Sequence, residues 1–282
     1  MPAMNYPTTI TALDNPKIKA VVKLRKHKGR REASQFIAQG LREIQRALAA
    51  GYEPHQFFYC PQLLDATSLE KLDAWANLGR WFELTPQVFD KIAGIQNPQG
   101  ILAICNTRHH PLESLDQPRT SAQSAQPQCA PLWLVAVGIE KPGNLGALAR
   151  SASAAGCAGL LVVDGVVDIY NPNAIRASTG AIFGLPIAVC TSQQAIAYLK
   201  EKKTQIYLTT PSAQQTYRQV DWTQPSAIVV GPEDTGLSQD WLDLPSANPI
   251  TIPMASQIVD SLNASVAAGV VLFEAAAQRR DA

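Results

Sequence analysis

The chain has 282 residues, of which 46% are hydrophobic, and its 24 Lys and Arg nearly balance its 23 Asp and Glu. This length suits two domains with real cores. The five cysteines are widely spaced without a CxxC pair, and no apolar run is long enough to span a membrane. These features argue against a disulfide framework, a metal site and a membrane partner. The N-terminus has no signal-peptide pattern, so we expect a cytoplasmic protein.

The first part of the chain predicts a small α/β domain over residues 1–110. Short apolar runs at 36–38 and 57–60 predict strands, residues 41–50 predict a helix that ends at Gly51, and residues 100–107 predict a closing strand.

A dense basic segment lies near the N-terminus. Between Lys17 and Arg31 the sequence has eight basic residues and no acidic one. Such a segment gains free energy by releasing counterions from a nucleic-acid backbone. The alternative is an ordinary solvated helix face. On the first interpretation, the candidate RNA-binding residues of this segment are Lys23, Arg25, Lys26, Lys28, Arg30 and Arg31.

Residues 111–131 are rich in Pro, Ser, Gln and Ala and have no helical or strand periodicity. This composition is typical of a flexible linker. We therefore expect a domain boundary here, with a second domain over residues 132–282.

After the linker, strand and helix patterns alternate. Strands are predicted at 132–139, 159–164, 186–190, 205–209, 227–231 and 250–253, and helices at 144–155, 171–182, 192–202 and 259–278. This alternation predicts an α/β domain with a mainly parallel sheet covered by helices on both faces.

Two of these strands end in loops of small residues, which favours a ligand site at the carboxyl edge of the sheet. The loop at 231–238 has the glycine spacing of a phosphate loop, but Leu237 stands where that motif needs lysine, which argues against a nucleoside triphosphate. Gly143 and Gly146 do not complete a dinucleotide fingerprint. Asp164 lies at the distance expected for the acid of that fingerprint, so a dinucleotide stays a weak alternative.

Three segments resemble motifs of the SpoU, or TrmH-like, branch of the SPOUT RNA methyltransferases. They are Asn144–Arg150 (NLGALAR), Gly231–Ser238 (GPEDTGLS), and Ile252–Met254 together with Ser261–Ser265 (IPM and SLNAS). Tyr170–Phe183 also resembles a segment of this branch. The resemblance covers residues 132–280, and residues 8–107 more weakly resemble the small substrate-binding domain that often precedes them.

The resemblance implies a 2′-O-ribose methyltransferase that uses S-adenosyl-L-methionine and acts on tRNA or rRNA. It also implies a C-terminal trefoil knot and a homodimer. Independently, the last predicted helix has apolar residues at spacings of three and four with small residues between them, which supports self-association. The alternative function is a non-catalytic RNA-binding or ribosome-associated protein that retains the fold.

The resemblance also assigns catalytic residues, namely Asn144, Arg150, Glu233, Asn263 and Ser265. For Arg150 we favour a phosphate-clamping, charge-stabilising role, because a guanidinium is a poor base. Glu233 is expected to orient Arg150 or an arginine of a partner subunit; its alternative is a solvent-exposed loop acid. Asn144, Asn263 and Ser265 are equally suited to capping helix starts.

The expected cofactor-binding residues follow the same motifs and would use backbone groups; they are Gly231, Gly236, Ile252, Met254 and Leu262. Arg176 is expected to contact RNA phosphate. Residues 255–258 (ASQI) depart from the glycine usual in the family, so we expect a stiffer loop near the methionine end of the cofactor.

Overall fold

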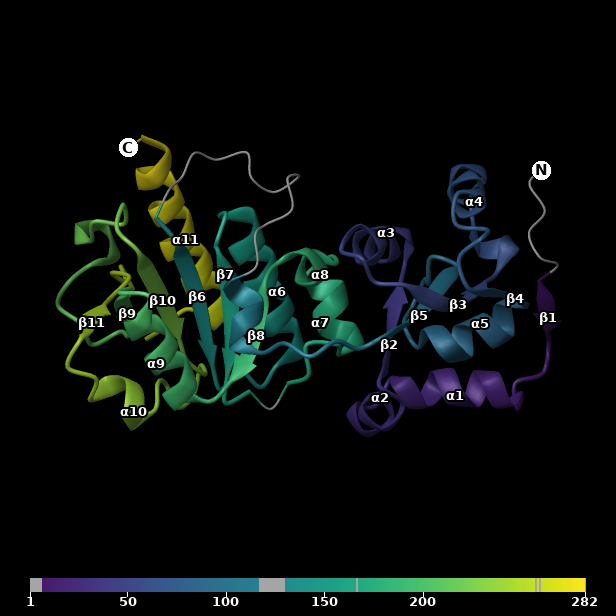
Figure 1. Ribbon diagram of the computed structural model, residues 1–282, viewed down its shortest axis with the longest axis horizontal. Coiled ribbons are helices and arrows are strands. Elements are labelled where there is room, and N and C mark those ends of the chain that lie inside the picture. The colour runs from purple at the N-terminus through teal and green to yellow at the C-terminus, as the bar shows by residue number, and fades with distance from the viewer. Residues whose placement is uncertain (1–6, 117–129, 166, 257, 259, 282) are drawn as a thin grey trace. The chain divides into compact units, whose positions relative to one another are not determined.

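The structure, a computed structural model, describes residues 7–116, 130–165, 167–256, 258 and 260–281 (Figure 1). The chain divides into two compact units. The first comprises residues 1–108 and 168–184, and the second comprises residues 109–167 and 185–282. The stretch 168–184, which we call the excursion, therefore packs within the first unit although the chain on both sides of it belongs to the second. The division expected from sequence did not include this excursion.

The first unit contains a five-stranded mixed sheet in the order β1-β4-β3-β5-β2. Its strands are β1 (Thr8–Ile10), β2 (Gln35–Gln39), β3 (Pro54–Tyr59), β4 (Arg80–Leu84) and β5 (Ile101–Asn106). Its helices are α1 (Pro16–Leu24), α2 (His27–Ala33), α3 (Leu41–Ala49), α4 (Ala66–Asp73), α5 (Pro86–Ala93), α7 (Pro172–Ala177) and α8 (Ala181–Gly184), with a short 3₁₀ helix η1 at Pro61–Leu63. The predicted strands correspond to β2, β3 and β5, and the predicted helix corresponds to α3.

The basic segment forms two helices with an apolar side. Asn15 caps α1 by accepting a hydrogen bond from the backbone of Lys17. Ile18 and Val21 are buried on α1 and belong to the same core as Phe89 of α5. Because the apolar residues of α1 face this core, Lys17, Lys19 and Lys23 extend to solvent.

Arg30 does not lie on the basic surface and is corrected from an RNA contact to a structural residue. Its side chain is 2% exposed, and its Nε donates to Asp168 Oδ2 at 2.6 Å. Its Nη1 donates to the carbonyls of Leu24 and Arg25 at 2.9 Å each. A buried guanidinium needs such partners, because an unpaired buried charge is strongly destabilising.

Arg25 is also held within the fold. Its Nη1 donates to Ile92 O at 2.9 Å and contacts Ala93 O, and its Nη2 donates to Gly94 O at 3.1 Å. These bonds satisfy carbonyls at the end of α5, where a cation is favourable. The other predicted RNA-binding residues are exposed, on α1 or beside it (Lys23, Lys26), on α2 (Lys28, Arg31) and on α7 (Arg176).

The excursion is anchored in the first unit by a buried aromatic cluster. The Tyr170 ring stacks on Phe36 with centroids 4.6 Å apart, and its hydroxyl lies 3.0 Å from that of Tyr52. Phe183 packs against Phe36 at 5.5 Å, and Arg46 donates to the carbonyl of Thr179 at 2.7 Å. Aromatic pairs of this kind each add stability beyond the area they bury.

The second unit contains a six-stranded sheet in the order β11-β9-β10-β6-β7-β8, and every pairing in it is parallel. Its strands are β6 (Leu132–Val137), β7 (Gly159–Val163), β8 (Ile187–Cys190), β9 (Gln205–Thr209), β10 (Ser226–Val230) and β11 (Ala247–Ile250). Its helices are α6 (Pro142–Ala154), α9 (Ser192–Glu201), α10 (Gln239–Leu242) and α11 (Ala264–Asp281), with a 3₁₀ helix η4 at Tyr217–Gln219.

The two faces of this sheet are covered by different helices (Figure 1). α6 and α11 pack against each other and on β6, β7 and β10, whereas α9 and α10 belong to the core on the opposite face. Strands β6, β7 and β10 are buried along their whole length, as expected for central parallel strands. The predicted mainly parallel sheet with helices on both faces is confirmed.

Several predicted boundaries were wrong. The last strand is Ala247–Ile250 rather than 250–253; it lies at the sheet edge, where Pro249 is tolerated. The helix predicted over 171–182 is two helices, because Thr179 and Gly180 between them have φ of 54° and 84°. The last helix begins at Ala264 rather than at Val259, which lies outside the described residues.

Part of the expected linker has regular structure. Leu112–Asp116 forms a 3₁₀ helix, η2, in which Leu115 is buried in the core that contains Trp133. Ser114 Oγ donates to Ile187 O at 2.8 Å. Residues 117–129 lie outside the described residues, and the knot implied by the resemblance stays a prediction. None of the helices described is long and apolar enough to cross a membrane.

The buried Arg30–Asp168 pair gives the first test. We expect Asp168→Ala to lower the free energy of unfolding by about 3–5 kcal/mol, because it leaves Arg30 buried without a counter-charge. Glu32→Ala is the control; it breaks the exposed Lys28–Glu32 pair at 3.8 Å and should cost no more than about 0.5 kcal/mol. Urea unfolding of both variants measures this, and a loss below 1 kcal/mol for Asp168→Ala would contradict the assignment of Arg30.

Candidate active site

Three loops meet at the carboxyl edge of the parallel sheet. The first leads from β6 into α6, the second follows β10, and the third runs from β11 to α11. β6 and β10 are neighbouring strands, and α11 packs on α6. The three segments picked out by resemblance therefore lie side by side in the fold, at the edge where parallel sheets bind ligands.

Glu233 lies at the centre of a hydrogen-bond network that we call the carboxylate cluster, composed of Lys141, Asn144, Glu233, Asn263 and Ser265. Glu233 Oε1 accepts from Asn144 Nδ2 at 2.8 Å and from Asn263 Nδ2, and its Oε2 accepts from Lys141 Nζ at 2.8 Å. The backbone of Ala264 also donates to it. Lys141 first, and then Asn144, hold the pKa of Glu233 below its ordinary value.

Asn263 both caps a helix and joins the cluster. Its Oδ1 accepts from the backbone and the hydroxyl of Ser265, at 3.0 and 2.6 Å, as an N-cap does. With its oxygen used in this way, the amide nitrogen of Asn263 points to Glu233 and to Asn144 Oδ1, which is 3.2 Å away. The capping interpretation of Asn263 is confirmed, and it sets the orientation of the amide in the cluster.

Asn144 does not cap its helix. α6 begins at Pro142 with Lys141 as its N-cap, so Asn144 lies within the first turn and its side chain is available to Glu233. The proline favours this early start, because its fixed φ suits the first helical position.

Arg150 is not part of the carboxylate cluster. It is exposed on α6, and its side chain makes no hydrogen bond or ion pair with any residue that the structure describes. Six residues separate it from Asn144, or about 1.7 helical turns, so the two side chains leave the helix in different directions. The expectation that Glu233 orients Arg150 is not met within one chain.

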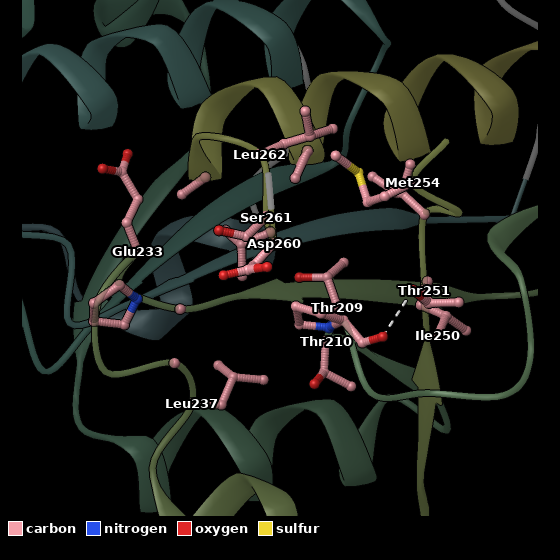
Figure 2. A pocket seen from close by; sticks show the side chains of 18 of the residues that line it. Thr209, Thr210, Glu233, Leu237, Ile250, Thr251, Met254, Asp260, Ser261 and Leu262 are labelled. Atoms are coloured by element: carbon pink, nitrogen blue, oxygen red, sulfur yellow. Dashed lines mark hydrogen bonds between the residues drawn. The ribbon is translucent and has the colours of Figure 1, made fainter. Parts of the chain in front are cut away.

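A pocket of about 690 Å³ lies beside the cluster and falls in the usual size range of small-ligand sites. It is bordered by the loops after β9, β10 and β11 and by the start of α11 (Figure 2). The five residues expected to bind the cofactor all line it, namely Gly231, Gly236, Ile252, Met254 and Leu262.

The lining of the pocket suits S-adenosylmethionine. Apolar side chains such as Leu242, Met254 and Leu262 offer a surface for a flat ring, and none of the described lining residues is Lys or Arg. A phosphate-rich ligand would need such basic groups, whereas a cationic one does not. In the described residues, no group of three or more His, Cys, Asp or Glu is arranged to hold a metal ion.

The conformation of the loop explains why residues 231 and 236 of the pocket are both glycine. A Cβ on Gly231 would lie 2.8 Å from the carbonyl carbon of Gly236, so only glycine lets the loop fold back this tightly. Gly236 has open space around it but a φ of 68°, which disfavours other residues.

Sequence reasoning missed two residues of this region. Lys141 lies three residues before the first motif and supplies the positive charge next to Glu233. Asp260 precedes Ser261 in the third motif and lines the pocket. Position beside a motif was the only available signal for either.

The network around Glu233 predicts a pH dependence. Because the pKa of Glu233 in the folded protein lies below its ordinary value of 4.5, the cluster stabilises the fold above that pH and loses this contribution as pH falls through the folded pKa. The ion pair raises the pKa of Lys141 above 10.5, so the contribution stays constant between about pH 5 and 10.

To measure this pH dependence, the free energy of unfolding of the wild type is compared with that of Glu233→Gln from pH 3 to pH 9. We expect the wild type to be more stable by at most about 1 kcal/mol at pH 7, with the difference shrinking below pH 4.5. Asp240→Asn, an exposed acid of α10, is the control for loss of a charge outside the cluster. An equal difference at pH 3 and pH 7 would contradict the role given to the carboxylate.

Comparison with known proteins agrees with this geometry. The model of the SpoU rRNA Methylase family matches residues 131–273, and that of the MRM3-like substrate binding domain matches residues 15–103. A Synechocystis protein named as an uncharacterized tRNA/rRNA methyltransferase is 31% identical over 97% of this chain and 97% of its own length.

Solved structures are similar over the whole chain. An RNA 2′-O ribose methyltransferase is 37% identical with a TM-score of 0.80, covering 97% of this chain and 100% of that one. The AdoMet-bound rRNA methyltransferase of Sinorhizobium meliloti is 30% identical with a TM-score of 0.81, covering 97% and 98%. With its three motifs joined at Glu233 and its whole length matched, the chain belongs to the SpoU rRNA methylase family.

Proposed function

We propose that this protein methylates a ribose 2′-hydroxyl of rRNA or tRNA with S-adenosylmethionine. The observation that carries the proposal is the carboxylate cluster, in which residues of all three motifs converge on Glu233 beside a pocket free of basic lining residues. A scaffold that had lost the chemistry would have no need for this convergence. The names of similar proteins, which include 2′-O ribose and AdoMet-bound methyltransferases, support the same reaction.

The pocket residues would hold the cofactor mainly through backbone groups of the loops at Gly231, Ile252 and Leu262. S-adenosylmethionine supplies an electrophilic methyl group carried on a sulfonium. The protein must position the ribose oxygen and let its proton leave as the new O–C bond forms. Correct positioning alone accounts for a large share of such an acceleration.

Glu233 is suited to positioning rather than to proton transfer. Its oxygens accept from Lys141, Asn144 and Asn263, and its lowered pKa makes it a weak base. It fixes the amides of Asn144 and Asn263 relative to the pocket.

Arg150 is the group we assign to the developing charge on the ribose oxygen and to an RNA phosphate. A guanidinium is a poor base and offers several donors, so it stabilises negative charge without accepting the proton. Its freedom from partners among the described residues leaves these donors available.

We infer that the active unit is a homodimer. Val266 and Phe273 are each 52% exposed on α11, and Val270 lies between them on the same side of the helix. A row of exposed apolar residues on a long helix suits packing against a second copy. A dimer also offers a way for the Arg150 of one chain to reach the carboxylate cluster of the other, which it does not reach in its own.

RNA binding is proposed for the exposed basic residues of the first unit. They are Lys23, Lys26, Lys28, Arg31 and Arg176. Their charge favours a phosphate backbone irrespective of sequence, so they would bind the RNA while other contacts select the nucleotide. We also propose that the protein is cytoplasmic, because its proposed substrates are rRNA and tRNA.

The proposed reaction is tested by transfer of labelled methyl from S-adenosylmethionine into total RNA lacking modification. We expect label in one RNA size class and one linkage resistant to alkaline cleavage. Arg150→Ala should reduce the rate about a hundredfold or more, as loss of a preorganised charge-stabilising donor does. Arg150→Lys, which keeps the charge but not the planar geometry, is the matched variant and should recover only part of the lost rate.

Two results would contradict this proposal. Full activity of Arg150→Ala would remove Arg150 from the mechanism. Binding of RNA without any binding of S-adenosylmethionine would favour the non-catalytic RNA-binding alternative.

The dimer is tested by mixing two inactive variants, Arg150→Ala and Glu233→Gln. If Arg150 acts across the interface, each mixed dimer has one site with both native residues, so random reassociation restores about a quarter of wild-type activity. If Arg150 acts within its own chain, the mixture stays as inactive as its components. Phe273→Asp is the control: it should yield monomers by light scattering and prevent the recovery.

A further inference from the structure

The charges around the pocket are uneven. Among the lining residues that the structure describes, only Glu233 and Asp260 are ionisable, and both are acidic. Glu233 is matched by Lys141 at 2.8 Å and by the amides of Asn144 and Asn263. Asp260 has neither a hydrogen bond nor an ion pair to any described residue.

The carboxylate of Asp260 also lies where a bound ligand would meet it. Figure 2 shows the Asp260 carboxylate together with Ser261 reaching toward the middle of the pocket, between Glu233 on one side and Thr209 on the other. The wall on the Glu233 side belongs to the carboxylate cluster, where the methyl acceptor must lie if the proposed function holds. Asp260 therefore presents an unmatched negative charge near the middle of the pocket, between the carboxylate cluster and Thr209.

The cofactor and its by-product differ in charge at the sulfur atom. S-adenosylmethionine carries a sulfonium, an ammonium and a carboxylate, so its net charge is positive. The by-product S-adenosylhomocysteine has a neutral thioether in place of the sulfonium and the same ammonium and carboxylate. An unmatched carboxylate near the sulfur favours S-adenosylmethionine over S-adenosylhomocysteine, because only S-adenosylmethionine has a sulfonium for the carboxylate to attract.

We propose that Asp260 is a specificity-determining residue that selects S-adenosylmethionine over S-adenosylhomocysteine by placing a carboxylate beside the sulfonium. The proposal rests on the proposed function of this pocket. Asp260 is exposed and neither caps a helix nor pairs with a described cation, so its carboxylate is available to a cationic ligand. It also gives the enzyme a way to release its product, which otherwise shares nearly every contact with the substrate form.

The test is calorimetric binding of three ligands to wild type and Asp260→Asn, without RNA and without turnover. The ligands are S-adenosylmethionine, S-adenosylhomocysteine and sinefungin, which carries an amine where the sulfonium methyl would be. We expect the variant to bind S-adenosylmethionine and sinefungin about fivefold more weakly, the effect of one partly exposed charge pair, and S-adenosylhomocysteine less than twofold more weakly. Asp240→Asn, an exposed acid of α10 outside the pocket lining, should change none of the three.

The outcomes separate the inference from the proposed function. Equal weakening of all three ligands would assign Asp260 to the shared ammonium and overturn the selection role while leaving the cofactor site intact. No change for any ligand would overturn it too. If the wild type binds none of them, the proposed function of the pocket fails and the inference fails with it.

Discussion

One carboxylate organises the functional edge of this protein. Glu233 receives donors from the first turn of α6, from the residue that caps α11 and from the Lys141 ammonium. The donors come from two different loops, the one that leads from β6 into α6 and the one that precedes α11, and in water each would be solvated separately. Joined to one anion, they fix the start of α11 against the start of α6, and the space left beside them is the pocket. Hydrogen bonds to a charged group are stronger than those between neutral groups, which suits them to hold the two helix starts together.

The same network explains why the glycines around it are needed. Gly231 lies two residues before Glu233, and its missing side chain lets the loop turn back on Gly236 so closely that any Cβ would collide. The turn directs Glu233 toward α11 while the backbone after it continues along the pocket wall. A phosphate loop has similar glycine spacing but ends in a lysine that grips its ligand. Here Leu237 is buried in the core instead, so the loop is a wall and not an anion cradle.

The sequence predicted the parallel sheet well because its strands are central and uniformly apolar, a signal that tertiary contacts reinforce. The predictions failed where tertiary context decides the structure. Pro249 argues against a strand until β11 is known to lie at an edge, and Arg30 looks like the rest of a basic run until Asp168, far away in sequence, is found beside it. The cluster residues were found by resemblance, whereas Lys141 and Asp260 required coordinates.

The excursion shows that the unit of family resemblance and the unit of packing differ. Residues 168–184 fall within the stretch matched by the SpoU family model, yet Asp168 and Tyr170 complete the core of the first unit. This arrangement places Arg176 in the same unit as the basic helices. Burial lowers the pKa of Arg25 first, and repulsion from Arg176 lowers it further, so the excursion adds a second cation to the electrostatic surroundings of the residue that ends α1.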